Sequence, residues 1–467
     1  MSDSTKGGNE RLVYVIAGVA AMGGLLFGFD TGVISGALLT IRRQFELSSM
    51  SQELVVSAVL VGCIFGAALS GKLADRFGRK NLIIACACVF FVGSFATASA
   101  HSVHALMWGR VVIGLAIGAA SFAVPLYISE ISPSRVRGAL VSLNQLMITI
   151  GIVLSYLVDD LFAGFEHGWR YMFLMGIGPA LLLGVGMLFL PASPRFLMGR
   201  GREGAAREVL ERLHGRADVE DDLAAIRENA AEESAGGWSE LAQPWLRPAL
   251  IIGVGIMFIQ QATGINTVIY YAPTIFQMAG FQSDVVAISA TLGVGVANVL
   301  FTIVAIRLVD RWGRKPLLSL GLVGIVASLF VLGMAFYMQD VLGAALRWVT
   351  VGSLLVYIAS FAVSLGPVAW LLISEIYPLE VRGLAMSLAT LSNWVFNFII
   401  ALTFLSIINV LGESGAFWLY AAVGVGGWFF CRYWVPETKG RSLEVIEANL
   451  KAGRRPRDLG EPLAAGS

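Results

Sequence analysis

Twelve long apolar stretches leave few folds open to this chain. Each is close to the roughly 20 residues that an α-helix needs to cross the hydrocarbon core of a bilayer. Only 14% of the residues are charged, whereas a typical soluble domain has about 25%. The chain therefore lacks the polar side chains to cover a water-soluble globule, and we predict an all-α membrane protein with twelve transmembrane helices. The expected spans are 14–37, 53–73, 81–100, 105–127, 138–158, 170–190, 248–272, 286–308, 316–338, 348–371, 383–405 and 415–435.

One long polar segment divides these stretches into two groups of six. Glu203 lies four positions before Arg207, and Glu208 lies four before Arg212. Opposite charges at this spacing stabilise a helix, so we expect short water-facing helices in this segment. The predicted organisation is an N-terminal six-helix bundle over 1–192, a cytoplasmic helical linker over 193–247, a C-terminal six-helix bundle over 248–436 and a cytoplasmic tail over 437–467.

The basic residues gather on one side of the expected membrane. If both termini lie on the same side, that side also holds the linker and most of the loop Lys and Arg residues. The loops opposite offer only Arg42, Arg43, Arg170 and Arg347. Short loops rich in Lys and Arg remain in the cytoplasm. We therefore expect a multi-pass protein of the inner membrane with both termini cytoplasmic.

Three charged motifs occur twice, in the same order. LADRFGRK at 73–80 returns at 308–315, SEISPSRVRG at 129–138 returns at 374–383, and PASPR at 191–195 has a counterpart at 436–441. The offsets are 235, 245 and 245 residues. These matches lie in charged loops, where the general similarity of apolar helices cannot produce them. The chain is predicted to be a tandem pair of six-helix units, which in transporters places the substrate site between the halves.

The sequence contains few residues in arrangements typical of catalytic, metal-binding or phosphate-binding sites. None of the four histidines or four cysteines has a second ligand at metal-binding spacing. No phosphate-binding loop follows a strand pattern, and no nucleophile stands beside a base. With a net charge of +1 the chain has no bulk field to attract nucleic acid. We expect neither an enzyme nor a metal, cofactor or nucleic-acid partner.

The motifs as a set resemble those of the sugar porter family of the major facilitator superfamily, and most of all its bacterial galactose or hexose–proton symporters. The likeness covers nearly the whole chain. It implies a monomer that imports a monosaccharide with a proton by alternating access. Ala192 departs from the family pattern, which has an acidic residue there, and so removes a partner for an arginine of the cytoplasmic gate. The matching segments are 28–36, 73–80, 109–110, 125–138, 144–152, 260–266, 309–316, 366–370 and 436–447.

Asp30 lies midway through the first apolar stretch. A carboxylate at that depth is costly and indicates a functional site with a partner to be found. Arg110, several residues into the fourth stretch, is the expected partner. The resemblance supports this, because proton-coupled sugar porters keep Asp where facilitative members tend to have Asn. If the pair separates in one conformation, Asp30 can bind a proton there and release it in the other; the alternative is a static ion pair between two helices.

Amide side chains within the apolar stretches are the candidate sugar ligands, because each offers donors and an acceptor without charge. Gln260 and Asn266 fall on different faces of an ideal helix, so we expect a break at Gly264. Pro367 is expected to bend the tenth span before Trp370. The alternative for each amide is a hydrogen bond between helices. The resemblance implies sugar contacts at Gln145, Gln260, Gln261, Asn266, Trp370 and Asn393, with Phe27, Tyr270, Tyr271, Asn298 and Asn397 in the pocket wall or gate.

The repeated acid-and-arginine motifs predict a cytoplasmic gate. Asp75 and Asp310 are expected to pair with arginines across helix ends, such as Arg135, Arg137 or Arg382. Such pairs would form when the cytoplasmic side closes; the alternative is that the arginines only anchor the topology. The expected gate residues are Asp75, Arg79, Glu130, Arg137, Asp310, Arg314, Glu375 and Arg382, with Glu130 and Glu375 as partners of Arg137 and Arg382.

Four other functions remain open at this point. An uncoupled sugar facilitator would have the same fold, but Asp30 beside Arg110 argues against it. A pentose or polyol–proton symporter would need only small changes in pocket geometry. A sugar sensor usually has a long cytoplasmic tail, and the tail after Pro436 is short. An exporter of hydrophobic compounds would favour aromatic walls over the amides of the seventh span.

Overall fold

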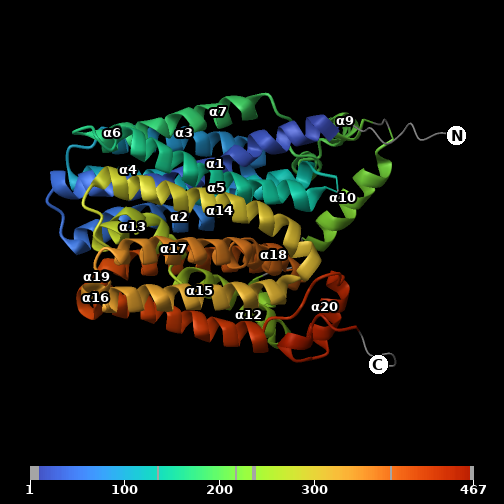
Figure 1. Ribbon diagram of the computed structural model, residues 1–467. Helices are drawn as coiled ribbons and strands as arrows, with labels where there is room; N and C mark the ends of the chain where they lie inside the picture. The colour runs from blue at the N-terminus through green and yellow to red at the C-terminus, as the bar shows by residue number, and fades with distance from the viewer. Residues whose placement is uncertain (1–9, 134–135, 216–217, 234–237, 379–380, 463–467) are drawn as a thin grey trace.

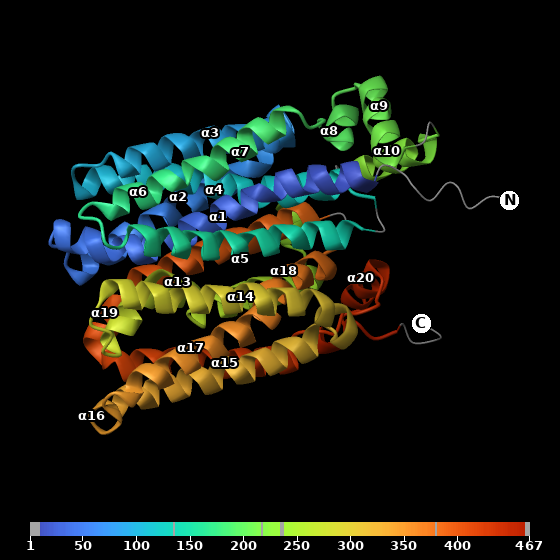
Figure 2. The ribbon, with the colours of Figure 1, turned by 45° about the horizontal axis from the view of Figure 1, so that its top comes forward.

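The computed structural model describes residues 10–133, 136–215, 218–233, 238–378 and 381–462, and it contains helices and no strands over these residues. Two bundles lie side by side, one from each half of the chain (Figures 1 and 2). Within the described residues, eleven helical stretches are long and apolar enough to span a membrane, and the last of them contains two spans. Twelve spans in two six-helix bundles therefore confirm the predicted fold class.

The first bundle contains six spans, the last of which is split in two at Gly176. Several of these helices extend beyond the apolar stretch from which they were predicted. The longest helix of this bundle is α1, with 35 residues. The helices are α1 (Glu10–Gln44), α2 (Ser49–Phe77), α3 (Arg79–Ala98), α4 (Val103–Ile131), α5 (Arg137–Phe162), α6 (Gly168–Met175) and α7 (Ile177–Leu188).

The second bundle contains three interrupted spans. The seventh breaks at Gly264, which has a φ of 87° that favours glycine, as expected from the sequence. The tenth breaks at Ser364, three residues before Pro367, whose missing N–H cannot bond one turn back. Gly412 divides α19 into two spans. The helices are α12 (Arg247–Ala262), α13 (Ile265–Met278), α14 (Asp284–Trp312), α15 (Arg314–Tyr337), α16 (Gln339–Leu342), α17 (Ala345–Val363), α18 (Leu365–Ile376) and α19 (Arg382–Tyr433).

Short helices connect the bundles at one end of the molecule, here called the linker end; the other end is the distal end. Arg207 pairs with Glu220, and Arg227 pairs with Glu203. Glu203 and Arg207, predicted to pair within one helix, still attract each other electrostatically, but each makes its closest ion pair with the neighbouring helix. The helices are α8 (Pro194–Gly199), α9 (Glu203–His214), α10 (Glu220–Glu233), α11 (Trp238–Leu241) and the 3₁₀ turn η1 (Pro244–Leu246).

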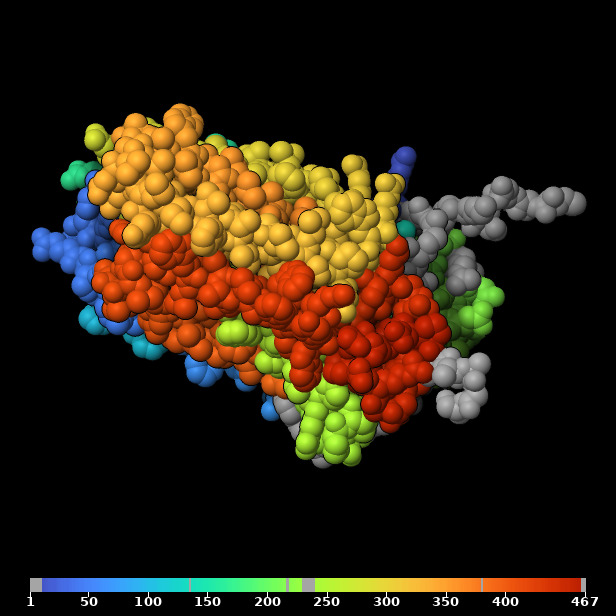
Figure 3. Space-filling view, turned by 60° about the horizontal axis from the view of Figure 1, so that its bottom comes forward, coloured from blue at the N-terminus to red at the C-terminus, as the bar shows by residue number. Residues whose placement is uncertain are grey.

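The C-terminal segment also lies at the linker end, as does the start of α1 (Figure 1). It contains α20 (Leu443–Lys451) and the 3₁₀ turn η2 (Pro456–Asp458). The Lys451 ammonium sits 5.3 Å from the ring centre of Trp245. Figure 3 shows this red segment against the yellow-green segment that leads into α12. The linker and the tail thus share one face of the second bundle.

Close backbone contact holds α2 against α4. A Cβ atom built on Gly114 would lie 1.9 Å from the Val59 carbonyl oxygen, and one on Gly62 would lie 2.1 Å from that of Val111. Helices in lipid gain no hydrophobic energy from association, so small residues that permit such close approach stabilise their packing. The same device joins α1 to α5 at Gly28, where a Cβ would meet the Ile148 oxygen at 1.9 Å.

We predict that Gly114→Ala destabilises the protein by about 1–3 kcal/mol, because the added methyl group forces two backbones apart. The thermal unfolding midpoint of the detergent-purified protein measures this. Gly352→Ala is the matched control, since a Cβ there meets nothing within 4 Å. Equal midpoints for the two variants would contradict the proposed packing.

Candidate functional site

Asp30 on α1 and Arg110 on α4 lie together in the first bundle. The Arg110 Nη1 is 3.6 Å from Asp30 Oδ1, and the two side chains are 0% and 3% exposed. Arg110 also places its Nη2 3.5 Å from the Val56 carbonyl and its guanidinium 5.5 Å from the ring centre of Phe173. Its Nε and Nη1 have no hydrogen-bond acceptor within the described residues. The pair is buried but loosely bonded, a geometry from which it can separate.

Four amide side chains form one buried network in the second bundle. Asn393 donates to Gln260 Oε1 at 2.7 Å, Gln261 donates to Asn393 Oδ1 at 3.2 Å, and Asn266 donates to Gln261 Oε1 at 2.8 Å. Gln260 donates to the carbonyl of Leu365, at the break in the tenth span, at 2.8 Å. The break at Gly264 brings Asn266 back toward Gln261 despite their different helical faces. The amides thus satisfy one another while offering donors and acceptors that another polar group could take over.

The other expected sugar contacts lie outside this network. Gln145 on α5 is partly buried and Asn298 on α14 is buried, and neither side chain makes a recorded hydrogen bond in the described structure. Trp370 is partly buried against the core of the second bundle. Gln145 belongs to the first bundle, so it could join the amides only through a molecule bound between the halves.

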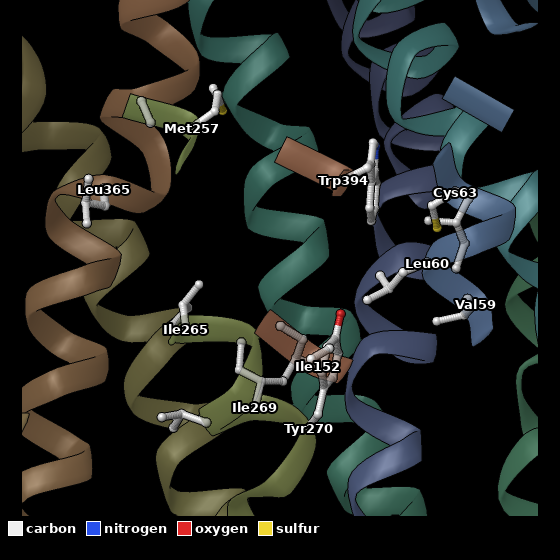
Figure 4. Close-up of a cluster of buried hydrophobic side chains, with 14 of the residues drawn as sticks. Val59, Leu60, Cys63, Ile152, Met257, Ile265, Ile269, Tyr270, Leu365 and Trp394 are labelled. Carbon is white, nitrogen blue, oxygen red and sulfur yellow. The ribbon is translucent and has the colours of Figure 1, made fainter. Parts of the chain in front are cut away.

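Two tyrosines of α13 bond to α19 close to the contact between the two bundles. The Tyr270 hydroxyl accepts from Asn397 at 3.3 Å and interacts electrostatically with Asp30 and Arg110 of the first bundle. Tyr271 donates to the Ala401 carbonyl at 3.3 Å. Figure 4 shows Tyr270 among buried side chains from both halves. Tyr270 therefore lies between the ion pair and the polar residues of α19.

An aromatic contact also crosses between the bundles. The ring centres of Phe27 on α1 and Trp394 on α19 are 5.2 Å apart. Trp394 is buried, and its indole N–H lacks an acceptor within the described residues. Sequence reasoning missed Trp394, although its position next to Asn393 is a signal that could have found it.

At the linker end the repeated motifs form the same ion-pair arrangement in each bundle. Arg79 contacts Asp75 at 3.2 Å and Glu130 at 3.1 Å. Ser193 donates to the other oxygen of Glu130. The second bundle repeats this arrangement: Arg314 contacts Asp310 at 3.6 Å and Glu375 at 2.6 Å, and Thr438 donates to Glu375 at 2.5 Å.

These pairs differ from the expected ones. Arg137 was expected to pair with Glu130, but it donates to the Ser132 carbonyl at 3.3 Å, because its side chain folds back over the turn before α5. Arg382 likewise donates to the Tyr377 carbonyl at 3.3 Å. Arg135, another expected partner, lies outside the described residues. Glu130 and Glu375 instead bind the arginines that begin α3 and α15.

The C-terminal tail supplies a further charge beside Arg382. Hydrogen bonds from Ser442 and from the backbone, together with the nearby Arg382 guanidinium, hold the pKa of Glu444 below its ordinary value. The ionised form of Glu444 is therefore the one that fits at the start of α20. This end of the second bundle is thus linked electrostatically to the tail.

The two halves differ at the position of Ala192. Its counterpart Glu437 accepts from the backbone N–H groups of Arg314 and Lys315, both at 3.0 Å, and so caps the start of α15. The corresponding helix α3 has no such acceptor within the described residues, and Ala192 packs on an apolar cluster of the linker. The sequence predicted the loss of an arginine partner; the structure indicates the loss of a helix cap.

Polar contacts between the bundles lie away from the linker end in the described structure. Arg43 pairs with Asp284, Arg42 donates to Gln277 at 2.7 Å, and Ser289 donates to Asp160 at 2.5 Å. Nearer the middle, Tyr156 donates to the Ile269 carbonyl at 3.2 Å. This is a conformation closed at the distal end. Sequence reasoning missed these contacts, since single charges near helix ends carry no motif.

Glu53, at the start of α2, forms the most buried of these contacts. Its side chain is 0% exposed and lies against α19, where its two oxygens accept from the Ser406 N–H and hydroxyl, both at 2.7 Å. It also interacts electrostatically with Tyr271 and Tyr420 of the second bundle. No cation pairs with it within the described residues. These hydrogen bonds require the two halves to stay together.

Comparisons with protein families, with individual proteins and with solved structures all point to one family. Residues 16–450 match the family described as "Sugar (and other) transporter". The chain is 47% identical to the putative metabolite transport protein YwtG of Bacillus subtilis, over 92% of this chain and 93% of that protein. It is 42% identical to the galactose-proton symporter of Escherichia coli, over 98% and 99%. The partially occluded inward open conformation of the xylose transporter XylE from E. coli superposes with a TM-score of 0.81 and 34% identity, covering 92% of this chain and 100% of that one.

We predict that Glu53→Gln and Ser406→Ala each favour opening of the distal end, because they weaken the bonds that hold it shut. Labelling by a membrane-impermeant thiol reagent at Ala287→Cys, a buried position in the first turn of α14, in a background without exposed Cys88, measures the opening. Both variants should label faster than the parent. Glu46→Gln, an exposed acid at the same end, is the control, and equal rates in all three would contradict the role of Glu53.

Proposed function

This chain belongs to the sugar transporter family, and we propose that it imports a monosaccharide together with a proton by alternating access. The buried Asp30–Arg110 pair is the observation that carries the proposal. A carboxylate placed midway along a spanning helix, with one loose partner, can bind and release a proton as that partner moves. The protein is then a secondary transporter of the inner membrane and not an enzyme.

We place the sugar between the bundles, beside the amide network. In the present conformation Gln260, Gln261 and Asn393 bond to one another. Sugar hydroxyls could replace these bonds without leaving a buried amide unpaired, which would cost about 1–3 kcal/mol per group. Gln145 from the first bundle and the Trp370 ring would complete the site.

A hexose such as galactose or glucose is our first candidate for the sugar. The galactose-proton symporter of Escherichia coli is 42% identical to this chain over 98% of this chain and 99% of its own length. A pentose is the second candidate, because the xylose transporter XylE shares the fold at 34% identity. Single hydroxyl differences depend on hydrogen-bond geometry at the amides. Competition uptake with a panel of sugars separates these candidates.

Tyr270 offers a route by which sugar binding could affect the proton site. It bonds to Asn397 in the second bundle and interacts electrostatically with Asp30 and Arg110 in the first. A sugar that rearranges α13 or α19 would move this hydroxyl relative to the ion pair. The Asp30–Arg110 separation, and with it proton affinity, would then change with sugar occupancy.

We assign the linker end to the cytoplasm, because the basic residues gather there. The present conformation, closed at the distal end, is then an inward-facing one. The acid and arginine clusters around Arg79 and Arg314 lie at the cytoplasmic end, each within its own bundle, and would form the surfaces that meet when that end closes. In this proposal the protein works as a monomer in the lipid bilayer.

We predict that Asp30→Asn loses uphill sugar accumulation and its pH dependence but retains sugar exchange, because Asn cannot carry the proton. In proteoliposomes, uptake of labelled sugar under a proton gradient measures accumulation. Replacement of internal labelled sugar by external sugar measures exchange. Asp340→Asn, an exposed acid at the distal end, should behave as the parent. Accumulation against a gradient by Asp30→Asn would exclude the coupling role. An uncoupled facilitator would show no alkalinisation when sugar is added to the parent, and a sensor would show little flux.

We predict that Gln261→Ala and Asn393→Ala raise the KM for sugar by about 5- to 150-fold, because each removes a hydrogen bond of about 1–3 kcal/mol. Initial uptake rates over a range of sugar concentrations measure the KM. Asn81→Ala is the control, since Asn81 is exposed and bonds only to Phe77 in the described structure. Unchanged KM in the first two variants would argue that the amides only join helices.

A further inference from the structure

Three arginines line an open hollow at the linker end of the first bundle. The hollow has a volume of about 450 Å³ and lies where α8 meets the turn between α2 and α3. A Cβ on Gly78 in that turn would lie 2.8 Å from the Phe196 ring of α8, so the two segments are in direct contact. Neither the ion pairs around Arg79 nor the proposed sugar site uses this hollow. Its lining residues are Arg76, Phe77, Asn81, Phe196, Arg200 and Arg202.

The three arginines have no carboxylate partner within the described residues. All of them are exposed, and none forms an ion pair there. The acids nearest to them in the sequence are bonded to other arginines, Asp75 to Arg79 and Glu203 to Arg227. Three positive charges thus share one hollow, and the described part of the protein provides no anion to balance them. An anionic ligand would fit the charge of this site.

Arg200 is held in place beside the end of α2. Its Nη2 donates to the main-chain carbonyls of Asp75, at 3.3 Å, and of Arg76, and its guanidinium lies 5.5 Å from the ring centre of Phe196. A guanidinium has five N–H donors in a planar fork, so others remain for a ligand. Such a fork fits two oxygen atoms of one phosphate group. Because the side chain is already fixed, binding an anion costs it little conformational entropy.

The hollow leads onto an exposed apolar stripe of α3. Asn81 lines the hollow in the first turn of this helix, and exposed side chains follow it along one face at helical spacing. From Ala85 to Phe95 this stripe extends about 15 Å along the helix axis. That is half of the roughly 30 Å hydrocarbon core of a bilayer, so the stripe has the length of the acyl chains of one leaflet. Its members are Ala85, Cys88, Val92 and Phe95.

The full set of arginines belongs to the first half alone. Arg76 recurs in the second half as Arg311, within the repeated motif. At the offset of 245 residues that relates the halves, however, the positions of Arg200 and Arg202 are taken by a valine and a glutamate. The arrangement that both halves share around Arg79 and Arg314 therefore does not need these two arginines. Anchoring the topology requires only positive charge in the loops, and it does not explain a common hollow between two aromatic rings.

We propose that this hollow binds the headgroup of an anionic phospholipid from the leaflet at the linker end. Arg76, Arg200 and Arg202 contact its phosphate oxygens, and its acyl chains lie along the exposed stripe of α3. Basic pockets at the cytoplasmic ends of membrane helices are suited to such headgroups. The bound lipid bridges the end of α2 to α8 and so ties the linker to the first bundle. That this leaflet is the cytoplasmic one rests on the orientation proposed above; the binding itself requires neither sugar nor proton transport.

Native mass spectrometry of the full-length protein in detergent, with phosphatidylglycerol or phosphatidylcholine added, tests the site. We expect the parent to retain one phosphatidylglycerol molecule and to bind phosphatidylcholine more weakly. Arg76→Gln and Arg202→Gln should each weaken phosphatidylglycerol binding about fivefold, the contribution of one basic residue near an anionic lipid surface. Arg212→Gln is the matched control, because it removes the same charge from an exposed linker position outside the hollow. It should bind the lipid as the parent does.

Equal retention of the two lipids by the parent would overturn the proposal, as would Arg76→Gln and Arg202→Gln proteins that bind like Arg212→Gln. Glycerol 3-phosphate, which has the phosphate group without acyl chains, separates a lipid site from a site for soluble anions. It should leave the lipid bound at equal concentration, and displacement of the lipid would overturn the assignment. No transport is measured, so failure of the lipid site would leave the proposed sugar and proton transport standing, and failure of transport would leave the lipid site standing.

Discussion

A charge within the apolar core of a bilayer has no water to solvate it, and this constraint governs the polar interior of the protein. Asp30, midway along α1, is stabilised there by Arg110. The uncharged amides of α12, α13 and α19 also lack water to bond to, and they bond to one another instead. Each solution holds in one arrangement of the helices, so moving the bundles must exchange one set of partners for another. Polar groups of this kind make the interior responsive to small polar ligands and to protons.

The interactions divide according to whether they lie within a bundle or between bundles. Arg79 with Glu130 and Arg314 with Glu375 remain inside their own halves. They can therefore persist through a rocking motion and keep the linker end of each bundle rigid. The pairing of Arg43 with Asp284 and the contact of Glu53 with Ser406 cross between halves, and they must break when the distal end opens. Rigid units with a small number of breakable contacts are what rocking bundles require.

The sequence predicted the architecture well because its signals are local. Apolar stretch lengths gave the spans, and Gly264 and Pro367 marked the breaks in the seventh and tenth. Asp30 and Arg110 could be paired because a charge at that depth needs a partner. The distal contact of Glu53 could not be predicted, since it lies near a helix end where a carboxylate is ordinary. The partner of Glu130 was also mispredicted: Arg137 follows it closely in the sequence, whereas Arg79 precedes it by 51 residues and reaches it only through the packing of α3 against α4.

Glu437 and Ala192 give the two halves different mechanical properties despite their shared motifs. The carboxylate of Glu437 ties the first N–H groups of α15 to the segment after the last span, so that turn resists distortion. The matching turn before α3 lacks this bond within the described residues and is tied instead through the Lys80 ammonium, which donates to the Leu188 and Leu190 carbonyls at 2.9 and 2.6 Å. A flexible lysine side chain restrains a helix end less tightly than a carboxylate bonded to two backbone N–H groups. We therefore expect the start of α3 to yield before the start of α15 when the bundles rock, an order that the repeat alone would not specify.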